Sequence, residues 1–326
     1  MNTPRGCTGE LFLSDCDFRG EIIYFIFVDR FHAGHPREVE GDPLADPTRK
    51  DWDKYWGGDL RGVINKLDYL EQTGVTALWI TPVFEQVEGL EAGTDRAPIH
   101  GYWLKDFKRL NKRWVDAPEE ASIFQSSKPT VFDELVAEVH RRDMKLILDV
   151  VCNHSSPATS EGKGRVYDDG KLVADFNDDK NGWYYHYGEV QDWDNEWQVQ
   201  HCEVAGLATF NEGNKQVRDY LKNSIKSWLD RGVDALRLDT VKHLPLWFWQ
   251  EFTTDMHSHN PEVFLFGEWI NNHPQNPKSL EYANKCGMSL LDFGICHGIR
   301  MALGHRCPEG FELLNEIMEA DQQYRG

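Results

Sequence analysis

Long apolar runs are absent from this sequence of 326 residues, although 40% of its residues are hydrophobic. No stretch approaches the roughly 20 apolar residues that a helix needs to cross a bilayer. The first 20 residues are interrupted by charges and a proline, so they lack the apolar region that a secretory signal requires. We therefore expect a cytoplasmic location and no membrane partner.

Positive charge is scarce. The chain has 35 Lys and Arg against 54 Asp and Glu, which gives a formal net charge of -19 at pH 7. Such a charge repels the phosphates of nucleic acids and anionic lipid head groups. A neutral ligand meets no such repulsion. We therefore expect an uncharged ligand and no nucleic acid partner.

Cysteine pairs are also lacking. There are seven cysteines, an odd number, and no two of them are spaced as CxxC. Cys152 and Cys296 lie within apolar runs that resemble strands. These features favour buried free thiols in a reducing compartment over disulfides.

Short apolar runs alternate with amphipathic stretches of helical spacing, which is typical of βαβ units. The predicted strands lie within 21–31, 75–84, 144–154, 233–239, 262–269 and 288–294. Helices are predicted over 60–74, 130–143 and 214–232, the second of which begins at a capping threonine and the others of which end at glycine. Because the apolar runs are nearly continuous, the strands are expected to form a parallel sheet that is buried on both faces.

A closed parallel barrel needs eight strands and about 250 residues, and only six strands are visible here. From 155 to 211 the alternation fails in a stretch rich in Gly, Asp, Asn and aromatic residues, which is too long for a structureless loop. The sequence therefore predicts an α/β fold: an incomplete (β/α)8 TIM-type barrel with a small inserted domain after the third strand. The expected units are 1–154 and 212–326 for the barrel and 155–211 for the insert.

In a parallel barrel the active site is built at the carboxyl ends of the strands, so polar residues there are candidates for chemistry. Three predicted strands end in such residues: Asp149, Asn153 and His154 at the third, Arg237 and Asp239 at the fourth, and Glu268 at the fifth.

Arg237 and Asp239 are two positions apart, so their side chains point to the same side of a strand. The Arg keeps the carboxyl ionised beside apolar neighbours. Alone, the pair is explained more simply as structural support for a strand end. Glu268 on the next strand changes that interpretation, because two neighbouring carboxyls are what glycoside hydrolysis needs: one attacks the anomeric carbon and the other protonates the departing oxygen.

Three segments, DVVCNH, GVDALRLDTVKH and FGEW, resemble conserved regions of the α-amylase family of glycoside hydrolases. Five more, YFIFVDRF, WGGDLRGVINKLDYL, GVTALWITPV, IHGYWLKDF and ANKCGMSLLDF, are similar to the cyclodextrin glucanotransferase and maltogenic amylase branch, so the resemblance covers nearly the whole chain. It implies that Asp239 is the nucleophile, that Glu268 is the general acid and base, and that Arg237, braced by Asp149, orients Asp239.

The resemblance also implies substrate contacts. His154 is expected to bind a sugar hydroxyl, Tyr102 to stack under that sugar with His100 lining the same pocket, and Lys242 and His243 to meet the leaving-group side. Outside these motifs, such histidines and tyrosines are more often structural. Aromatic rings pack against pyranose faces, and among the aromatic residues of the insert we expect Trp183 to contact sugar.

The sequence departs from the family in one catalytic element, the Asn-His-Asp segment that supplies a third carboxylate at the seventh strand. Three explanations stay open: a truncated record of a longer enzyme, which we favour, barrel strands supplied by a second chain, or lost activity. No other protein partner is expected.

Calcium binding is expected to be weak or absent, and no cofactor is required. Relatives bind a metal through an aspartate together with the asparagine that corresponds to Asn153, but this chain has Thr209 in place of the aspartate, and calcium prefers carboxylate oxygen. Ala33 and His35 likewise replace the oxygen donors of a second, N-terminal calcium site.

The predicted function is retaining hydrolysis of α-1,4-glucosidic bonds in starch, glycogen or maltooligosaccharides. Cyclodextrin-forming relatives carry a bulky aromatic residue where this chain has Ala205, which favours hydrolysis. The alternatives are a 4-α-glucanotransferase and an inactive, truncated glycan-binding protein.

Overall fold

The structure is a computed structural model that describes residues 18–35, 41–117, 121–123, 128–270, 276–304 and 309–320. The strands are β1 (Ile23–Ile26), β2 (Ala77–Ile80), β3 (Phe84–Gln86), β4 (Leu104–Leu110), β5 (Lys145–Val150), β6 (Val166–Asp168), β7 (Lys171–Ala174), β8 (Ala235–Leu238), β9 (Phe264–Gly267) and β10 (Ser289–Leu290). The α-helices are α1 (Val28–Phe31), α2 (Leu60–Asn65), α3 (Leu67–Gln72), α4 (Val131–His140), α5 (Glu196–His201), α6 (Lys215–Leu229), α7 (Leu246–His259), α8 (Pro277–Lys285), α9 (Phe293–Ile299) and α10 (Gly310–Ala320). Short helical segments are η2 (Phe176–Asp178), η3 (Val241–His243) and η4 (Arg300–Gly304).

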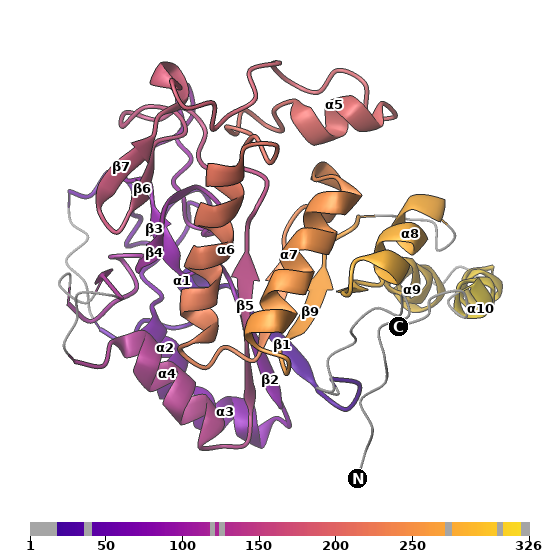
Figure 1. Ribbon diagram of the computed structural model, residues 1–326. Helices are drawn as coiled ribbons and strands as arrows, with labels where there is room; N and C mark the ends of the chain where they lie inside the picture. The colour runs from indigo at the N-terminus through magenta and orange to yellow at the C-terminus, as the bar shows by residue number, and fades with distance from the viewer. Residues whose placement is uncertain are drawn as a thin grey trace, which may run out of the picture.

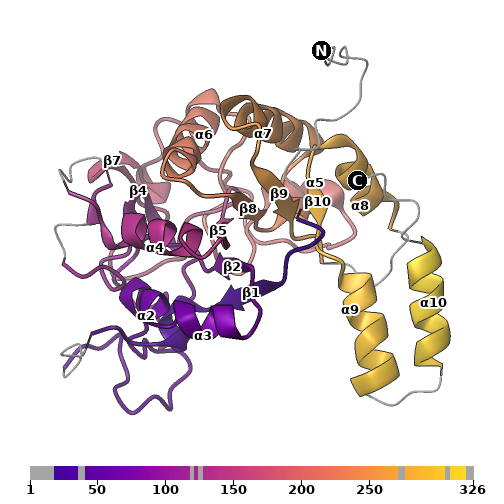
Figure 2. The ribbon, with the colours of Figure 1, turned by 90° about the horizontal axis from the view of Figure 1, so that it is seen from below.

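Six strands form one parallel sheet in the order β1-β2-β5-β8-β9-β10. All six strands predicted from the sequence lie in it, in chain order, and helices cover its outer face (Figures 1 and 2). The sheet is curled like part of a barrel, which confirms the predicted incomplete (β/α)8 architecture. Its first strand lies at an edge and leaves Ile23, Tyr24 and Phe25 more than 40% exposed.

Several elements differ locally from the predictions. The first predicted strand ends at Ile26, and helix α1 follows it. The helix predicted over 60–74 is broken at Lys66 into α2 and α3. The last strand is shorter than predicted because Asp292, whose side chain accepts a hydrogen bond from the Ile295 amide, begins α9. Cys296 was expected to be buried and is instead exposed in α9.

A second sheet has the order β3-β4-β6-β7. Its hairpin β6–β7 comes from the 155–211 segment, and β6 pairs with β4 through Asp106 and Tyr167. The segment therefore shares a sheet with strands that precede it in the chain, and the predicted unit boundaries stay a prediction.

The helices are fixed by buried aromatic side chains. Trp228 of α6 is fully buried against Phe84 and Phe132, and its indole N–H donates to the carbonyl of Phe107 in β4 at 2.8 Å. This joins α6 to β3 and β4, which both belong to the second sheet, and to α4. A Thr130–Asp133 capping box begins α4, as the capping threonine predicted.

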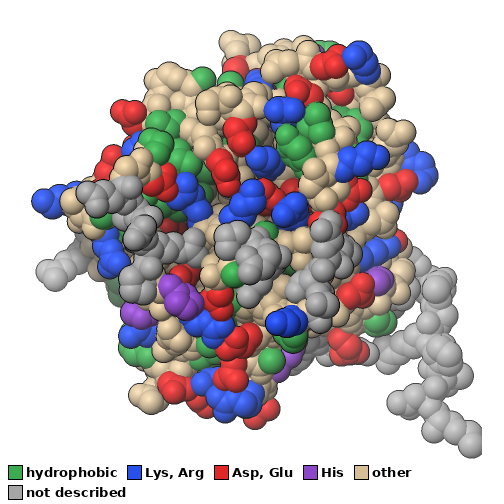
Figure 3. Space-filling model, turned by 90° about the vertical axis from the view of Figure 1, so that its left-hand side faces the viewer, with side chains coloured by type: hydrophobic (Ala, Val, Ile, Leu, Met, Phe, Trp, Pro, Cys, Tyr) green, Lys and Arg blue, Asp and Glu red, His purple; other side chains and the backbone are tan. Residues whose placement is uncertain are grey.

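On the side that carries β6 and β7, acidic and basic side chains of the described residues are interspersed (Figure 3). Among the described residues, no helix is long and apolar enough to span a membrane. Cys152, Cys202 and Cys286 are buried free thiols.

Candidate active site

The strand register places the polar residues at the carboxyl ends of β5, β8 and β9 at the same height along the sheet. Asp149 of β5 is paired with Arg237 of β8, so their side chains leave the sheet at the same height. Asp239 and Glu268 immediately follow β8 and β9, where Leu238 is paired with Gly267. Residues that are far apart in the sequence therefore meet at the carboxyl ends of three adjacent strands.

Arg237 lies at the centre of this group and is 4% exposed. Its Nη1 donates to Asp149 Oδ1 and to Asp239 Oδ1, at 2.8 Å each. Its Nη2 is 3.0 Å from Glu268 Oε2. One guanidinium thus orients three carboxylates, an arrangement for which the rigid fork of arginine is suited.

Asp149 is fully buried and accepts hydrogen bonds beyond that of Arg237. Tyr102 donates its hydroxyl to Asp149 Oδ2 at 2.8 Å, and Trp79 donates its indole N–H to the same oxygen at 3.0 Å. With three donors around it, Asp149 is held as a brace. Asp149 is completely buried, whereas Asp239 is 6% exposed and the Glu268 side chain 19%, which leaves these two as the carboxyls that a ligand can reach.

Burial, together with the neighbouring charges of Asp149 and Glu268, raises the pKa of Asp239 to about 7, although Arg237 opposes the rise. Burial acts to lower the pKa of Arg237, but the three carboxylates outweigh it and raise that pKa. The guanidinium therefore stays charged while Asp239 titrates near neutrality.

Glu268 is positioned from the loop that follows Asp239. Thr240 has φ +51°, a left-handed conformation that is costly for a β-branched residue. Its amide N is 3.4 Å from Glu268 Oε2. A Cβ at Gly267 would lie 2.4 Å from Val241, so a glycine is required for this close approach of β9 to η3.

His154 has both ring nitrogens buried without a hydrogen bond to the described residues. Burial, with His243 and His100 nearby, lowers its pKa to about 3, so the ring is neutral. His100 Nδ1 accepts from the Tyr102 amide at 3.0 Å, and the two rings stack at 5.5 Å. A neutral ring with free donor and acceptor atoms is suited to a sugar hydroxyl.

The residues after Asp239 lie against α5. His243 Nδ1 is hydrogen-bonded to the Val199 carbonyl at 2.9 Å, and burial lowers its pKa to about 4. Lys242 Nζ lies 5.7 Å from the ring of Trp193, an indole that is 57% exposed. Lys242, His243 and Trp193 therefore form one side of the site.

Trp183 is not brought to this group. It is 5% exposed and packs against Tyr220 of α6, at 5.4 Å between ring centroids. Little of its ring is left for a sugar. The aromatic residues of the insert that do expose large surfaces are Tyr187, Trp193 and Trp197.

The residues at the two calcium positions do not fit the ion. Asn153 Nδ2 donates directly to the His243 carbonyl at 2.9 Å, and Thr209 donates its hydroxyl to the Cys202 carbonyl at 3.2 Å. Neither of these two side chains is a carboxylate, the oxygen donor that calcium prefers. The described residues contain no cluster of three or more His, Cys, Asp or Glu that could hold a metal.

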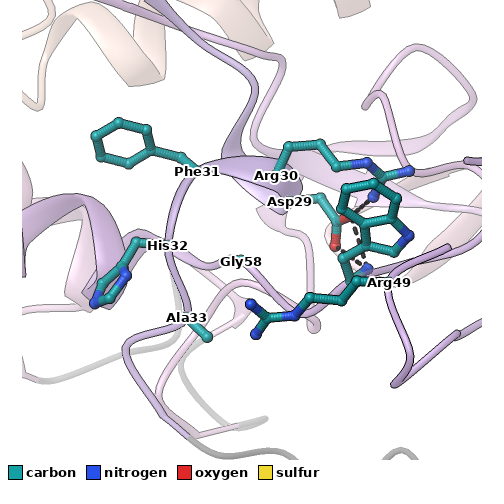
Figure 4. A pocket seen from close by; sticks show the side chains of 8 residues that line it. Asp29, Arg30, Phe31, His32, Ala33, Arg49 and Gly58 are labelled. Atoms are coloured by element: carbon teal, nitrogen blue, oxygen red, sulfur yellow. Dashed lines mark hydrogen bonds and ion pairs between the residues drawn. The ribbon is translucent and has the colours of Figure 1, made fainter.

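The N-terminal position is equally unsuited. A cavity of about 170 Å³ there is lined by Asp29 and Ala33 together with Arg30 and Arg49 (Figure 4). Asp29 is occupied by Arg30 and by the amides of Trp56 and Gly57. Two guanidinium groups beside a carboxylate that is already paired disfavour a dication.

Two residues of the site were given no role in the sequence interpretation. Trp79 donates to Asp149, and the guanidinium of Arg237 lies 5.3 Å from its ring centroid. A tryptophan in a buried strand needs a partner for its indole N–H, so the sequence already indicated that Trp79 donates a hydrogen bond to a polar residue on a neighbouring strand. Thr240 gave none, because its left-handed backbone is set by the tertiary structure.

The fold and the cluster together define a class: a parallel barrel protein with acidic side chains gathered by an arginine at the strand ends. A comparison with known protein families identifies one that matches most of the chain. The family described as alpha amylase, catalytic domain, matches residues 25–297. The chain belongs to this family.

The most similar curated proteins include cyclomaltodextrin glucanotransferases. That of Klebsiella oxytoca is 35% identical in an alignment of 317 positions that covers 93% of this chain and 46% of that protein. That of Thermoanaerobacterium thermosulfurigenes is 36% identical over 94% of this chain and 43% of that protein. The chain thus spans less than half the length of these two relatives.

Solved structures of the same kinds of enzyme are also similar to this chain in fold. A γ-cyclodextrin glucanotransferase from an alkalophilic Bacillus clarkii has a TM-score of 0.85 at 32% identity, over 96% of this chain and 44% of that one. The α-amylase of Geobacillus thermoleovorans, in complex with acarbose, has a TM-score of 0.71 at 30% identity, over 93% of this chain and 58% of that one.

Proposed function

We propose that the chain carries the catalytic carboxyls of a retaining α-glucan hydrolase that cleaves α-1,4 bonds. The observation that supports this most directly is the contact of Arg237 with both Asp239 and Glu268. It orients two carboxyls at neighbouring strand ends, one to attack and one to transfer a proton.

In the proposed reaction, an oxygen of Asp239 attacks the anomeric carbon while Glu268 gives its proton to the departing glycosidic oxygen. The bond from carbon to Asp239 forms as the glycosidic bond breaks. Glu268, now a carboxylate, takes a proton from water, whose oxygen displaces Asp239. The protein ends as it began, and the glucan is cut with retained configuration.

We infer the substrate contacts from polar groups near the carboxyls and from one exposed ring. The nitrogens of His154 are free to bind a hydroxyl, and the ring of Tyr102 is fixed because its hydroxyl is held by Asp149. Lys242, His243 and Trp193 would receive the leaving-group side. An α-glucan, which is neutral, also suits a protein of net charge -19.

A glucanotransferase is the second candidate, supported by the relatives of that name. The two differ only in whether water or a sugar hydroxyl accepts the glycosyl group. The exposed ring of Trp193 beside Lys242 offers a surface for a sugar acceptor, while Ala205 lacks the bulky ring associated with cyclisation.

The test is release of reducing sugar from starch by the purified chain, with Asp239→Asn and Glu268→Gln as controls. We expect Asp239→Asn to lower the rate by at least about 10³-fold. Glu268→Gln should lower it about 10²- to 10⁴-fold on starch, and far less on an aryl glycoside whose leaving group needs no proton. Equal rates for Asp239→Asn and the unaltered chain would contradict the proposal.

A further inference from the structure

Four rings beside α5 form a continuous group, which we call the α5 ring stack: Tyr185, Tyr187, Trp197 and His201. Their centroids are 5.7 Å apart for Tyr185 and Tyr187, 4.9 Å for Tyr187 and Trp197, 5.1 Å for Trp197 and His201, and 4.9 Å for His201 and Tyr185. We propose that the α5 ring stack is an additional binding surface for α-glucan chains outside the cleavage site. The substrate class rests on the proposed function.

The outer rings of the stack are exposed although they are large and apolar. Tyr187 is 58% exposed and Trp197 is 50% exposed. Aromatic rings of this size contribute most when they are covered, so a folded protein that holds two of them side by side in water presents a surface for a ligand.

The stack is also held rigidly. Tyr185 Oη is 3.2 Å from Glu212 Oε1, and His201 Nδ1 lies 2.8 Å from the Trp197 carbonyl. Asn195 caps the helix by accepting from the Gln198 amide. Tyr185 and His201 are thus held by hydrogen bonds, and the exposed rings of Tyr187 and Trp197 pack on them, so less side-chain freedom is lost on binding than for isolated rings.

The chemistry of the surface suits a neutral sugar. A pyranose has an apolar face that packs on an aromatic ring and a rim of hydroxyls that need polar partners. Glu196 of α5 is exposed, with Lys278 Nζ 3.1 Å from its Oε1, and this pair offers polar groups to such hydroxyls. A stable protein partner would need about 800 Å² of surface, far more than two half-exposed rings provide.

The position of α5 connects the stack to the cleavage site. Helix α5 lies beyond the carboxyl ends of β5 and β9 (Figure 1). It is joined to the segment after Asp239 by the His243 contact with Val199, and to α8 by Gln200 Nε2, 3.3 Å from Tyr282 Oη. The rings therefore stand on the helix that packs against the segment after Asp239, outside the cleavage site, and a glucan long enough to reach both places would bind more tightly than a short one.

The test measures binding of a long soluble amylose and of maltotriose by calorimetry, in an Asp239→Asn background that prevents turnover. Replacing both exposed rings, as Tyr187→Ala with Trp197→Ala, should weaken amylose binding about tenfold and affect maltotriose less. Trp52→Ala is the matched control: Trp52 is 70% exposed, packs on Trp56, and should leave amylose binding unchanged.

A second variant distinguishes the loss of the aromatic ring faces from a general disturbance of folding. Tyr187→Phe with Trp197→Phe keeps two apolar faces and should retain most of the affinity. Unchanged amylose binding in the double alanine variant, or an equal loss in Trp52→Ala, would overturn the inference, as would no binding of amylose by the Asp239→Asn protein. If the unaltered chain releases no sugar while the rings still bind amylose, the proposed hydrolysis fails and the α5 ring stack stands.

Discussion

Arg237 Nη1 lies 2.8 Å from Asp239 Oδ1 and, at the same distance, from Asp149 Oδ1. The same nitrogen therefore donates to a carboxylate that is enclosed by donors and to one that is slightly exposed. Because Asp149 is also held by Tyr102 and Trp79, the guanidinium is fixed from behind and presents Asp239 in one orientation.

Removal of Arg237 should destabilise the protein. Arg237→Met leaves three carboxylates without their shared cation in a buried site, which costs about 3–5 kcal/mol. Arg237→Lys keeps the charge but loses the fork, and should lie between Arg237→Met and the unaltered chain. Urea unfolding at pH 8 measures both. Equal stability of Arg237→Met and the unaltered chain would contradict the central role of Arg237.

The raised pKa of Asp239 predicts how stability depends on pH. An aspartate in the unfolded chain titrates near pH 4, and Asp239 in the folded chain near 7. The folded state thus holds the proton more tightly, and the stability this gives is lost as pH rises from about 4 to 7. Asp239→Asn removes the effect, so its melting temperature relative to the unaltered chain should rise over that window and then level off. A constant difference from pH 4 to 9 would show that the pKa is not raised.

The same titration predicts an acidic limb in activity. Only the ionised Asp239 attacks, so kcat/KM should fall as pH drops below about 7. Asp149 is one of the charges that raise this pKa, so Asp149→Asn should move the limb to lower pH while it lowers the rate. A limb that stays in place would mean that another group controls it.

Chelation should have little effect on stability. Asn153 contacts the His243 carbonyl directly and Thr209 offers a hydroxyl that is already used. The melting temperature in EDTA is expected to match that in calcium within about 1 °C, since a bound ion at 100 times its Kd would add about 2.7 kcal/mol. A large fall in EDTA would show that a calcium site exists. Thr209→Asp supplies the missing carboxylate and should make the melting temperature respond to calcium.

Products should be linear. Ala205 is exposed, has φ +54°, and presents only a methyl group, so it gives a glucan chain no ring around which to curl. Chromatography of the products from starch should show maltooligosaccharides, and cyclodextrins among them would favour the glucanotransferase.

Much of the site followed from the sequence by itself. Strand periodicity placed Asp149, Arg237, Asp239 and Glu268 at strand ends, because a polar residue that closes an apolar run lies at the carboxyl end of a strand in a parallel sheet. The two-residue spacing put Arg237 and Asp239 on one side. These inferences depend only on local backbone geometry, which the order of residues determines.

Other features were decided by the tertiary structure. Trp183 has an aromatic ring of the kind that contacts sugars, but its packing against Tyr220 of α6 buries that ring. Trp79 reaches Asp149 only because β2 and β5 are neighbours in the sheet. Tyr187 and Trp197 become a surface because α5 turns their rings toward each other and away from the core. Contacts between residues distant in the sequence, and which side of a ring faces water, depend on how the elements pack, and no local pattern encodes that.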